Sequence, residues 1–531
     1  MTLLYASSTK LFSFLLSSSS SNKAKNNYYP ISSDKTTVHI AIIPHKDGTK
    51  ASIKCLNPIE PRSSSSSTTS TCKKPRLSSF LKFSGASTVL YNNKRNQQRS
   101  NNSSNSSNND NNSNAASTCT LTTTNSSNTI IILSDHFQRL PPELIQKLFF
   151  HLDAISIGKL AQTCQRLHMI CNDDHGVWRT LFVKHFNNYL FTSTMINHRQ
   201  QLVQQKVPSL LSSPSWYSLY RNHYILERRW QRGQANVRYL TGHTDSVYCI
   251  VRYRKQYIVS GSRDHSVKLW DLDNYMCVAS ETHHEGSVLC LKIASDDEWM
   301  VSGSSDGTCV LWKLSGGNTK GNKLQPLSRL RGHTSGVLDV CIVENKYIVT
   351  ASRDATVRVW DRYSAKELRR LEGHAGPVNA LQAHGHHVVS ASGDSKVKLW
   401  NAETGECLRT FDGHTRGLAC ARFDGMRIYS GGQDAVLRVW NAQTGQCSAI
   451  LEGHDQLVRT VDCYGDRAVT GSYDRTIKLW DSVSGQCLLS FQGGHDSWVF
   501  NVLLSRTRII SAGQDKRIMI LDFGNDLNLA Y

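Results

Sequence analysis

The sequence lacks several features that would each point to a known class of protein. No run approaches the roughly 18 apolar residues that a membrane-spanning helix needs, so no membrane segment is expected. None of the 15 cysteines forms a C-x-x-C pair, the spacing of zinc ribbons and dithiol redox sites. No Gly-rich phosphate loop or metal-ligand spacing is present, so no cofactor is expected. Most cysteines lie in apolar stretches, which is typical of buried thiols in a reducing compartment and predicts a cytoplasmic or nuclear protein.

Acidic residues are scarce near the N-terminus. Residues 1–130 hold 15 Lys and Arg against 4 Asp and Glu, which is a net +11 of the formal +19 of the chain. Between residues 100 and 129, 25 of 30 residues are Ser, Thr or Asn. Such a segment buries too little apolar surface to offset chain entropy, so residues 1–130 are predicted to be a disordered basic tail. Because the charge lies in this tail, without an aromatic–basic module, nucleic acid is not expected as a specific partner.

The next two segments have helical patterns. In residues 137–186, Leu144, Leu148 and Leu152 recur at helical spacing, and Pro141 suits a helix start. Residues 187–236 are predicted to be a helical linker. Its second half places a group of aromatic and imidazole side chains near one face: Trp216, Tyr220, His223 and Trp230.

From Val237 onward the chain repeats a unit of about 40 residues. The repeat reads G-H-x-x-x-V, then an apolar strand, then S-x-D-x-x-x-x-x-W-D, with departures such as His283 in place of the glycine before His284. The histidines are His243, His284, His333, His374, His414, His454 and His495, and the acids are Asp264, Asp306, Asp354, Asp394, Asp434, Asp474 and Asp515. Six units carry the tryptophan, and the seventh has Leu521. This is the WD40 signature, and it predicts a seven-bladed β-propeller over residues 237–523, followed by a C-terminal tail at 524–531.

Two further expectations follow from the repeat. The strand Val237–Thr241 precedes the first G-H, so it should complete the seventh blade and close the ring. Each repeat also holds a His, a Ser or Thr and an Asp, which resembles a hydrolase triad. Because the set occurs seven times at fixed positions, we expect these groups to hydrogen-bond one another and the blade tryptophan. The protein is therefore not expected to be an enzyme.

Function in a propeller should lie where residues vary between repeats. One such position is five residues after each histidine and holds Tyr248, Leu289, Leu338, Asn379, Ala419, Arg459 and Phe500. Another directly precedes each aspartate and holds Arg263, Ser305, Arg353, Gly393, Gln433, Tyr473 and Gln514. With Arg416, four arginines should converge on one channel mouth, and guanidinium groups bind phosphate bidentately. The alternative is that these arginines pair with nearby aspartates or are simply solvated.

Residues 140–181 resemble an F-box, the helical module that binds the adaptor of SCF ubiquitin ligases. The matching residues are Leu140, Pro141, Glu143, Leu148, Phe149, Leu152, Leu160, Cys164, Trp178 and Leu181. Leu167 and His168 stand where the family usually has a tryptophan after the cysteine. The resemblance implies an adaptor-binding surface drawn from Leu140, Pro141, Glu143, Leu144, Leu148, Leu152, Leu160 and Trp178, with some apolar members serving as the core of the box.

Within F-box propeller proteins, residues 137–523 resemble the β-transducin-repeat-containing (β-TrCP) family, through stretches such as GHTRGLACARFDG and GHDQLVRTV. In that family the top face of the propeller holds a degron with two phosphoserines. The matching positions are Tyr248, Arg263, Ser287, Ser305, Leu338, Asn379, Arg416, Gly417, Leu457 and Arg459, and Arg353 replaces a lysine. Trp498 stands where the family has another arginine, and Gln433 replaces a serine.

The composition, the repeat and the resemblance together predict a mostly β protein: a seven-bladed WD40 propeller preceded by a small α-helical F-box, linker helices and a disordered tail. The resemblance also implies a non-catalytic substrate receptor, with the SCF adaptor and, through it, the cullin and RING subunits and phosphorylated proteins as partners. A non-degradative protein-interaction scaffold is the alternative, since the departure at Leu167 could weaken adaptor binding.

Overall fold

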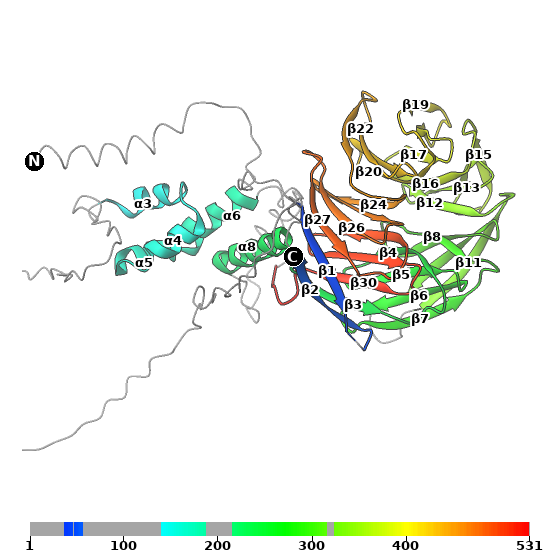
Figure 1. The fold of residues 1–531 in the computed structure, drawn as a ribbon. Helices are drawn as coiled ribbons and strands as arrows, with labels where there is room; N and C mark the ends of the chain where they lie inside the picture. Colours follow the sequence, from blue (N-terminus) through cyan, green and yellow to red (C-terminus); the bar gives the residue numbers. More distant parts are fainter. Residues whose placement is uncertain (1–36, 46, 57–139, 187–214, 316–322, 530–531) are drawn as a thin grey trace, which may run out of the picture. The chain divides into compact units, whose positions relative to one another are not determined.

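The computed structural model describes residues 37–45, 47–56, 140–186, 215–315 and 323–529, and it is mostly β (Figure 1). Antiparallel four-stranded units follow one another along the chain, as the repeat predicts. The first three blades comprise β4 (Val247–Tyr253), β5 (Tyr257–Ser262), β6 (Ser266–Asp271) and β7 (Met276–Thr282); β8 (Val288–Ile293), β9 (Trp299–Ser304), β10 (Thr308–Ser315) and β11 (Lys323–Arg331); and β12 (Val337–Val343), β13 (Tyr347–Ser352), β14 (Val357–Asp361) and β15 (Glu367–Leu371).

The remaining blades follow the same plan. They comprise β16 (Val378–His384), β17 (His387–Ser392), β18 (Val397–Asn401) and β19 (Cys407–Phe411); β20 (Leu418–Phe423), β21 (Arg427–Gly432), β22 (Leu437–Asn441) and β23 (Cys447–Leu451); β24 (Val458–Tyr464), β25 (Arg467–Ser472), β26 (Ile477–Asp481) and β27 (Cys487–Gln492); and β28 (Val499–Leu504), β29 (Arg508–Gly513) and β30 (Ile518–Asp522) with a fourth strand from elsewhere. The second and third strands of each blade are apolar and mostly buried, so each blade packs its faces against its neighbours.

The fourth strand of the seventh blade is β3 (Asn236–Leu240), which pairs antiparallel with β30 in the register Val237↔Leu521. Strands far apart in sequence therefore share one blade. This confirms the prediction that the segment before the first G-H completes the seventh blade. The pairing removes two sheet edges and joins the start of the repeat region to its end.

Two strands near the N-terminus extend this part of the sheet. β1 (Val38–Pro44) and β2 (Lys50–Leu56) form an antiparallel hairpin. β1 pairs in parallel with β27 of the sixth blade, and β2 pairs with β3 of the seventh, which gives one ten-stranded sheet (Figure 1). The expectation of a disordered tail over residues 1–130 is therefore wrong for residues 38–56. The rest of that tail lies outside the described residues.

The hairpin is held mainly by two isoleucines. Ile40 and Ile42 are 0 % and 3 % exposed and join a core cluster with Leu226 and Trp230. Gly233 lies directly against this contact: it has φ +63°, and a Cβ placed there would lie 1.8 Å from the Cδ1 atom of Ile40. Glycine is therefore required at this position by both backbone conformation and space.

The helices lie between the hairpin and β3 in the sequence. They are α3 (Pro142–Phe149), α4 (Ala154–Leu160), α5 (Gln165–Cys171), the π-helical turn η1 (Asp174–Trp178), α6 (Arg179–Phe186) and α8 (Trp216–Arg232). Asp153 caps α4 by accepting a hydrogen bond from the amide of Ser156, and Ser215 caps α8 in the same way. No helix in the described ranges is long and apolar enough to span a bilayer.

Helix α8 contacts both the F-box-like helices and the propeller. At its start, the Tyr217 amide donates a 2.8 Å hydrogen bond to Asp174 of η1. Near its end, the Trp230 indole stacks on Phe523 with ring centroids 3.7 Å apart and donates a 3.0 Å hydrogen bond to the Arg506 carbonyl. Glu227 also forms a 2.6 Å ion pair with Arg467. Arg506 and Arg467 lie at the turns between the first and second strands of blades 7 and 6, so α8 is fixed to this end of both blades.

Truncation of Ile40 tests the contribution of the hairpin to stability. Ile40→Ala should lower the free energy of unfolding by about 2–5 kcal/mol, because it opens a cavity between the hairpin, α8 and blade 6. Ile43→Ala is the matched control, since Ile43 lies on the same strand and is 49 % exposed; its effect should stay within about 0.5 kcal/mol. Denaturant unfolding of the intact chain, followed by tryptophan fluorescence, measures both. Equal effects of the two substitutions would show that the hairpin does not pack as described.

Candidate binding face of the propeller

The repeated polar residues form one hydrogen-bond network in each blade. In the first blade, Nδ1 of His243 lies 2.8 Å from Asp264, and Nε2 lies 2.7 Å from the hydroxyl of Ser260. The Trp270 indole donates a 2.7 Å hydrogen bond to the same hydroxyl. The His–Asp and His–hydroxyl contacts recur in the other six blades, and the tryptophan contact recurs in every blade that has the tryptophan. This confirms the structural role predicted for these groups.

The aspartate of each network also holds a strained turn. The residue after it has a positive φ in all seven blades, from +61° at Ala435 to +80° at Gly307. Six of the seven are not glycine, and a non-glycine residue pays of order 1 kcal/mol for this conformation. The aspartate offsets the cost by accepting the amide of the residue two positions later, as Asp264 does from Ser266 at 3.0 Å. The turn between the second and third strands is therefore tied to the loop that carries the histidine.

Burial of these networks sets their protonation. Burial lowers the pKa of His243, His284, His333, His374 and His454 below the ordinary 6.5, and the aspartate contacts only partly offset this. Burial alone would raise the pKa of Asp306, but hydrogen bonds from Thr308 and His284 lower it to about 2. The folded network therefore combines neutral histidine with ionised aspartate.

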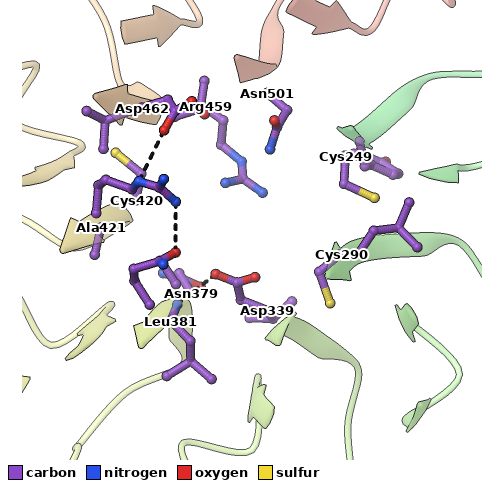
Figure 2. Close-up of a pocket in the computed structure, with 18 of the residues that line it drawn as sticks. Cys249, Cys290, Asp339, Asn379, Leu381, Cys420, Ala421, Arg459, Asp462 and Asn501 are labelled. Atoms are coloured by element: carbon purple, nitrogen blue, oxygen red, sulfur yellow. Dashed lines mark hydrogen bonds and ion pairs between the residues drawn. The ribbon is translucent and has the colours of Figure 1, made fainter. Parts of the chain in front are cut away.

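The positions that vary between repeats are brought together by β-bulges. In every blade, the pairing of the first strand with the second skips one residue, and that residue is the one five positions after the histidine. A bulge redirects the side chain that it carries. Among the lining residues of the central cavity, which has a volume of about 140 Å³, are six of the seven bulge residues: Tyr248, Leu289, Leu338, Asn379, Ala419 and Arg459. Figure 2 shows Arg459 pointing toward the open centre of this cavity.

A second repeated contact places the residues before each aspartate on the same face. In each blade this residue donates its backbone N–H to the carbonyl three positions after the histidine, as Arg263 does to Ser246 at 2.9 Å and Tyr473 to Leu457 at 3.1 Å. The contact recurs at Ser305, Arg353, Gly393, Gln433 and Gln514. The two sets of predicted positions therefore lie on one face, around the channel mouth.

The four arginines differ in their surroundings. Arg353 and Arg416 are exposed, and no carboxylate of the described residues forms an ion pair with either. Arg263 has Asp245 at 3.7 Å, but the two side chains are 59 % and 41 % exposed, so solvent screens this pair. Arg459 is half-buried and donates a 3.2 Å hydrogen bond to the Ala419 carbonyl. Asp245 lies near Arg263, and the charge of Arg459 opposes the rise that burial causes in the pKa of Asp339. The exposed Arg353 and Arg416 fit the alternative of solvated arginines.

The other predicted residues of this face provide hydroxyl, amide and apolar groups. The Ser305 hydroxyl accepts a 2.8 Å hydrogen bond from the Ser287 amide, and the Asn379 side chain donates to the Leu418 carbonyl at 2.6 Å. Leu338, Gly417 and Leu457 are half-buried. At the positions where the sequence departs from the family pattern, Gln433 and Trp498 are exposed, and Trp498 stacks on Tyr473.

Deeper in the channel lies a group of charged residues that the sequence analysis did not identify. Lys292 Nζ and Arg422 Nη1 lie 3.3 and 3.1 Å from the Gln382 amide oxygen, and Arg422 Nε lies 3.1 Å from Asp462. Asp339 accepts a 2.7 Å hydrogen bond from the Leu381 amide of the next blade. Burial lowers the pKa of Lys292 and raises that of Asp339 to about 6. These residues could have been found in the sequence, because the otherwise apolar first strand of each blade contains a polar side chain.

The F-box-like helices expose part of the predicted adaptor surface. Leu144 is 45 % exposed, Pro141 and Glu143 are exposed, and Leu140, Leu148, Leu152 and Leu160 are half-buried. Trp178 is 6 % exposed, and its indole donates a 2.7 Å hydrogen bond to the Cys171 carbonyl. Its side chain therefore belongs to the core of the module and is not available for direct contact. Three further apolar residues of these helices are exposed and were not among the predicted ones, Ile155 at 51 %, Met169 at 65 % and Val183 at 40 %.

One cluster offers metal-ligand atoms at the opposite strand ends. Among the described residues, Glu344, His386 and Glu403 bring three such atoms within 4.8 Å of one another. The two ring nitrogens of His386 each face a different carboxylate, at 2.9 and 3.3 Å. Each ring nitrogen of His386 therefore has a carboxylate oxygen within 3.3 Å.

Comparison with known proteins agrees with this architecture. An F-box-like family model matches residues 137–184, and the WD domain, G-beta repeat model matches 234–271, 275–313, 324–361, 365–401, 405–441 and 445–481. The chain therefore carries an F-box-like module and WD40 repeats, and the structure adds the seventh blade.

Individual relatives match parts of the chain. It is 25 % identical to WD repeat-containing protein pop1 of Schizosaccharomyces pombe over 41 % of this chain and 30 % of that protein. It is 30 % identical to F-box/WD repeat-containing protein 7 of Drosophila melanogaster over 30 % of this chain and 12 % of that protein. Small ribosomal subunit protein RACK1y of Oryza sativa subsp. japonica is 33 % identical over 25 % of this chain and 38 % of that protein. The matches thus span less than half the length of each relative and support an F-box/WD-repeat architecture.

The protonation of the networks predicts how stability depends on pH. Below about pH 6.5 the unfolded chain binds protons at histidines whose folded pKa is lowered, so the free energy of unfolding should fall as pH falls. Aspartates with a lowered folded pKa extend the loss below about pH 4, with the same sign. Scanning calorimetry of the intact chain from pH 7.5 to 4.5 should show a steadily falling Tm. A Tm that is constant or rises toward pH 5 would contradict the neutral-histidine network.

Proposed function

We propose that the chain is the substrate-recognition subunit of an SCF-type ubiquitin ligase, and that the channel mouth of its propeller binds phosphorylated proteins. The observation that supports the proposal is that Arg263, Arg353, Arg416 and Arg459 belong to loops and bulges of the same face, and that Arg353 and Arg416 are exposed and form no ion pair within the described residues. A phosphate dianion provides the missing charge, and guanidinium groups bind it bidentately. The resemblance of these positions to the β-TrCP family supports the same ligand.

The chain would perform no bond chemistry in this role. The F-box-like helices would bind the SCF adaptor, and the propeller would hold the substrate close to the ubiquitin-charged partner enzyme. Catalysis then arises from effective concentration, because a bound substrate lysine meets the charged enzyme repeatedly. Helix α8 suits this role, since it contacts η1 at its start and blades 6 and 7 at its end.

Charge reversal in the pocket tests the ligand. Arg459→Glu should weaken binding of a phosphoserine peptide by at least about 10-fold, because a charged hydrogen bond contributes of order 1.5–3 kcal/mol and the new carboxylate repels the phosphate. Arg263→Glu should act in the same direction. Fluorescence anisotropy with the phosphorylated peptide and its unphosphorylated form measures both.

Arg369→Glu is the matched control for these variants, since Arg369 is exposed on the outer strand β15 and undergoes the same change of charge. It should leave the affinity unchanged. Undiminished binding by both pocket variants, with folding verified by circular dichroism, would refute the assignment of the pocket.

The adaptor surface is tested separately. Leu144→Asp should reduce binding to the purified SCF adaptor by at least about 10-fold, because a carboxylate would be buried in an apolar contact. Val183→Asp is the matched control, an equal change at a 40 % exposed residue of α6 outside the predicted surface. Failure of the unchanged chain to bind the adaptor would favour the alternative of a non-degradative scaffold. The sequence feature that supports this alternative is the departure from the family pattern at Leu167.

A further inference from the structure

Aromatic side chains cluster on one side of the channel mouth. Tyr473 and Trp498 stack with ring centroids 4.3 Å apart and an interplanar angle of 4°. Phe500 packs edge-on against both, at 6.0 and 6.4 Å. Tyr248 of the first blade continues the cluster, with its ring 4.9 Å from Phe500. The four rings form a continuous cluster across blades 6, 7 and 1, here named the aromatic platform.

The platform occupies the same structural positions as the polar part of the mouth. Tyr248 and Phe500 are bulge residues, as Arg459 is. Tyr473 directly precedes its aspartate, as Arg353 does. The mouth therefore carries arginines on blades 1, 3, 5 and 6 and aromatic rings on blades 6, 7 and 1, at equivalent positions of the repeat.

One ring of the platform is poised to receive a ligand group. Trp498 is 40 % exposed, whereas Phe500 beside it is only 5 % exposed. Tyr473 covers one face of the Trp498 indole, so this ring is held in place before a ligand arrives. A ring fixed in advance binds a flat partner with little loss of side-chain entropy.

The nearby charges decide what kind of side chain fits. Asp496, two residues before Trp498, is already paired with Arg517. Arg459 on blade 6 and Arg263 on blade 1 flank the platform in sequence order around the ring. A basic side chain would be repelled by these arginines. The indole offers a phosphate one N–H donor but no positive charge, so it binds a second phosphate less well than a guanidinium would. An aromatic side chain gains both apolar burial and stacking.

We propose that the aromatic platform binds an aromatic side chain of the phosphorylated ligand. The inference rests on the proposed function and deepens it. The preferred ligand carries a phosphoserine that binds the arginines of the mouth and a Phe, Tyr or Trp that binds the platform. Trp498 is then a specificity-determining residue.

The test uses the intact chain and a set of synthetic peptides with one fixed phosphoserine. Each flanking position is replaced in turn by Phe, Leu, Arg or a second phosphoserine, and affinities are measured by fluorescence anisotropy. At one position Phe should bind about 3- to 10-fold more tightly than Leu, the range expected from an aromatic pair beyond its buried area. Arg or phosphoserine at that position should bind no better than Leu.

Substitutions of Trp498 then assign the preference to the platform. Trp498→Ala should make the affinities for the Phe and Leu peptides equal, and Trp498→Phe should retain most of the preference for Phe. Trp498→Arg should change the preference to the peptide with the second phosphoserine. Tyr464→Ala is the matched control, because Tyr464 is 43 % exposed at the far end of β24; the preference for Phe should not change. The Trp498→Phe variant also distinguishes a lost contact from a misfolded face.

The outcomes separate this inference from the proposed function. Tight binding of phosphopeptides with equal affinities for Phe and Leu at every position would overturn the platform and leave the arginine pocket intact. A preference for Arg at the position nearest Trp498 would also overturn it, in favour of a cation–π site. Binding of Phe peptides that does not depend on phosphorylation would overturn the proposed phosphate ligand but support the platform.

Discussion

The interaction on which the rest of the structure depends is the buried hydrogen bond between the histidine and the aspartate of each blade. It joins the loop before the first strand to the turn between the second and third strands, as in the 2.8 Å contact of His243 with Asp264. The same aspartate stabilises a left-handed residue in that turn. Because these loops and turns carry the arginines, hydroxyls and aromatic rings of the mouth, the network holds the proposed binding residues in place, which would lower the entropic cost of binding a ligand.

The second constraint is closure of the ring. β3 completes the seventh blade, and the hairpin β1–β2 then joins that blade to the sixth in one sheet. The hairpin and the end of α8 meet at Gly233, where no Cβ can be accommodated against Ile40. The end of β2 and the end of α8 also lie close together, because Cys55 Sγ is 3.9 Å from the Arg232 carbonyl. The F-box-like module lies between these two ends in the sequence, so both of its connections begin from the same part of the propeller.

Much of this could be predicted from the sequence, because the repeated His, Asp and Trp residues have hydrogen-bonding partners at fixed spacing. That regularity identified the blades, the closing strand and the two variable positions of the mouth. The hairpin could not be predicted in the same way. Its alternating Val38, Ile40 and Ile42 form a short signal within a polar, basic tail, and its partner strands lie hundreds of residues away. Two further features were not predicted: the burial of Trp178, and the position of Lys292 and Asp339 in the channel. Periodicity does not show which side of a helix or strand is covered or meets a cavity.

The central claim is that one chain joins a phosphate-dependent receptor to an adaptor-binding module. The most direct measurement is purification of the intact chain from its own cells, with and without phosphatase treatment, and mass spectrometry of the proteins that accompany it. A Leu140→Ala, Pro141→Ala variant is the control. We expect adaptor and cullin to accompany the intact chain with or without phosphatase treatment and to be absent from the variant. Substrate proteins should be lost only after phosphatase treatment. Absence of adaptor and cullin from both chains, with partners that persist after phosphatase treatment, would contradict it.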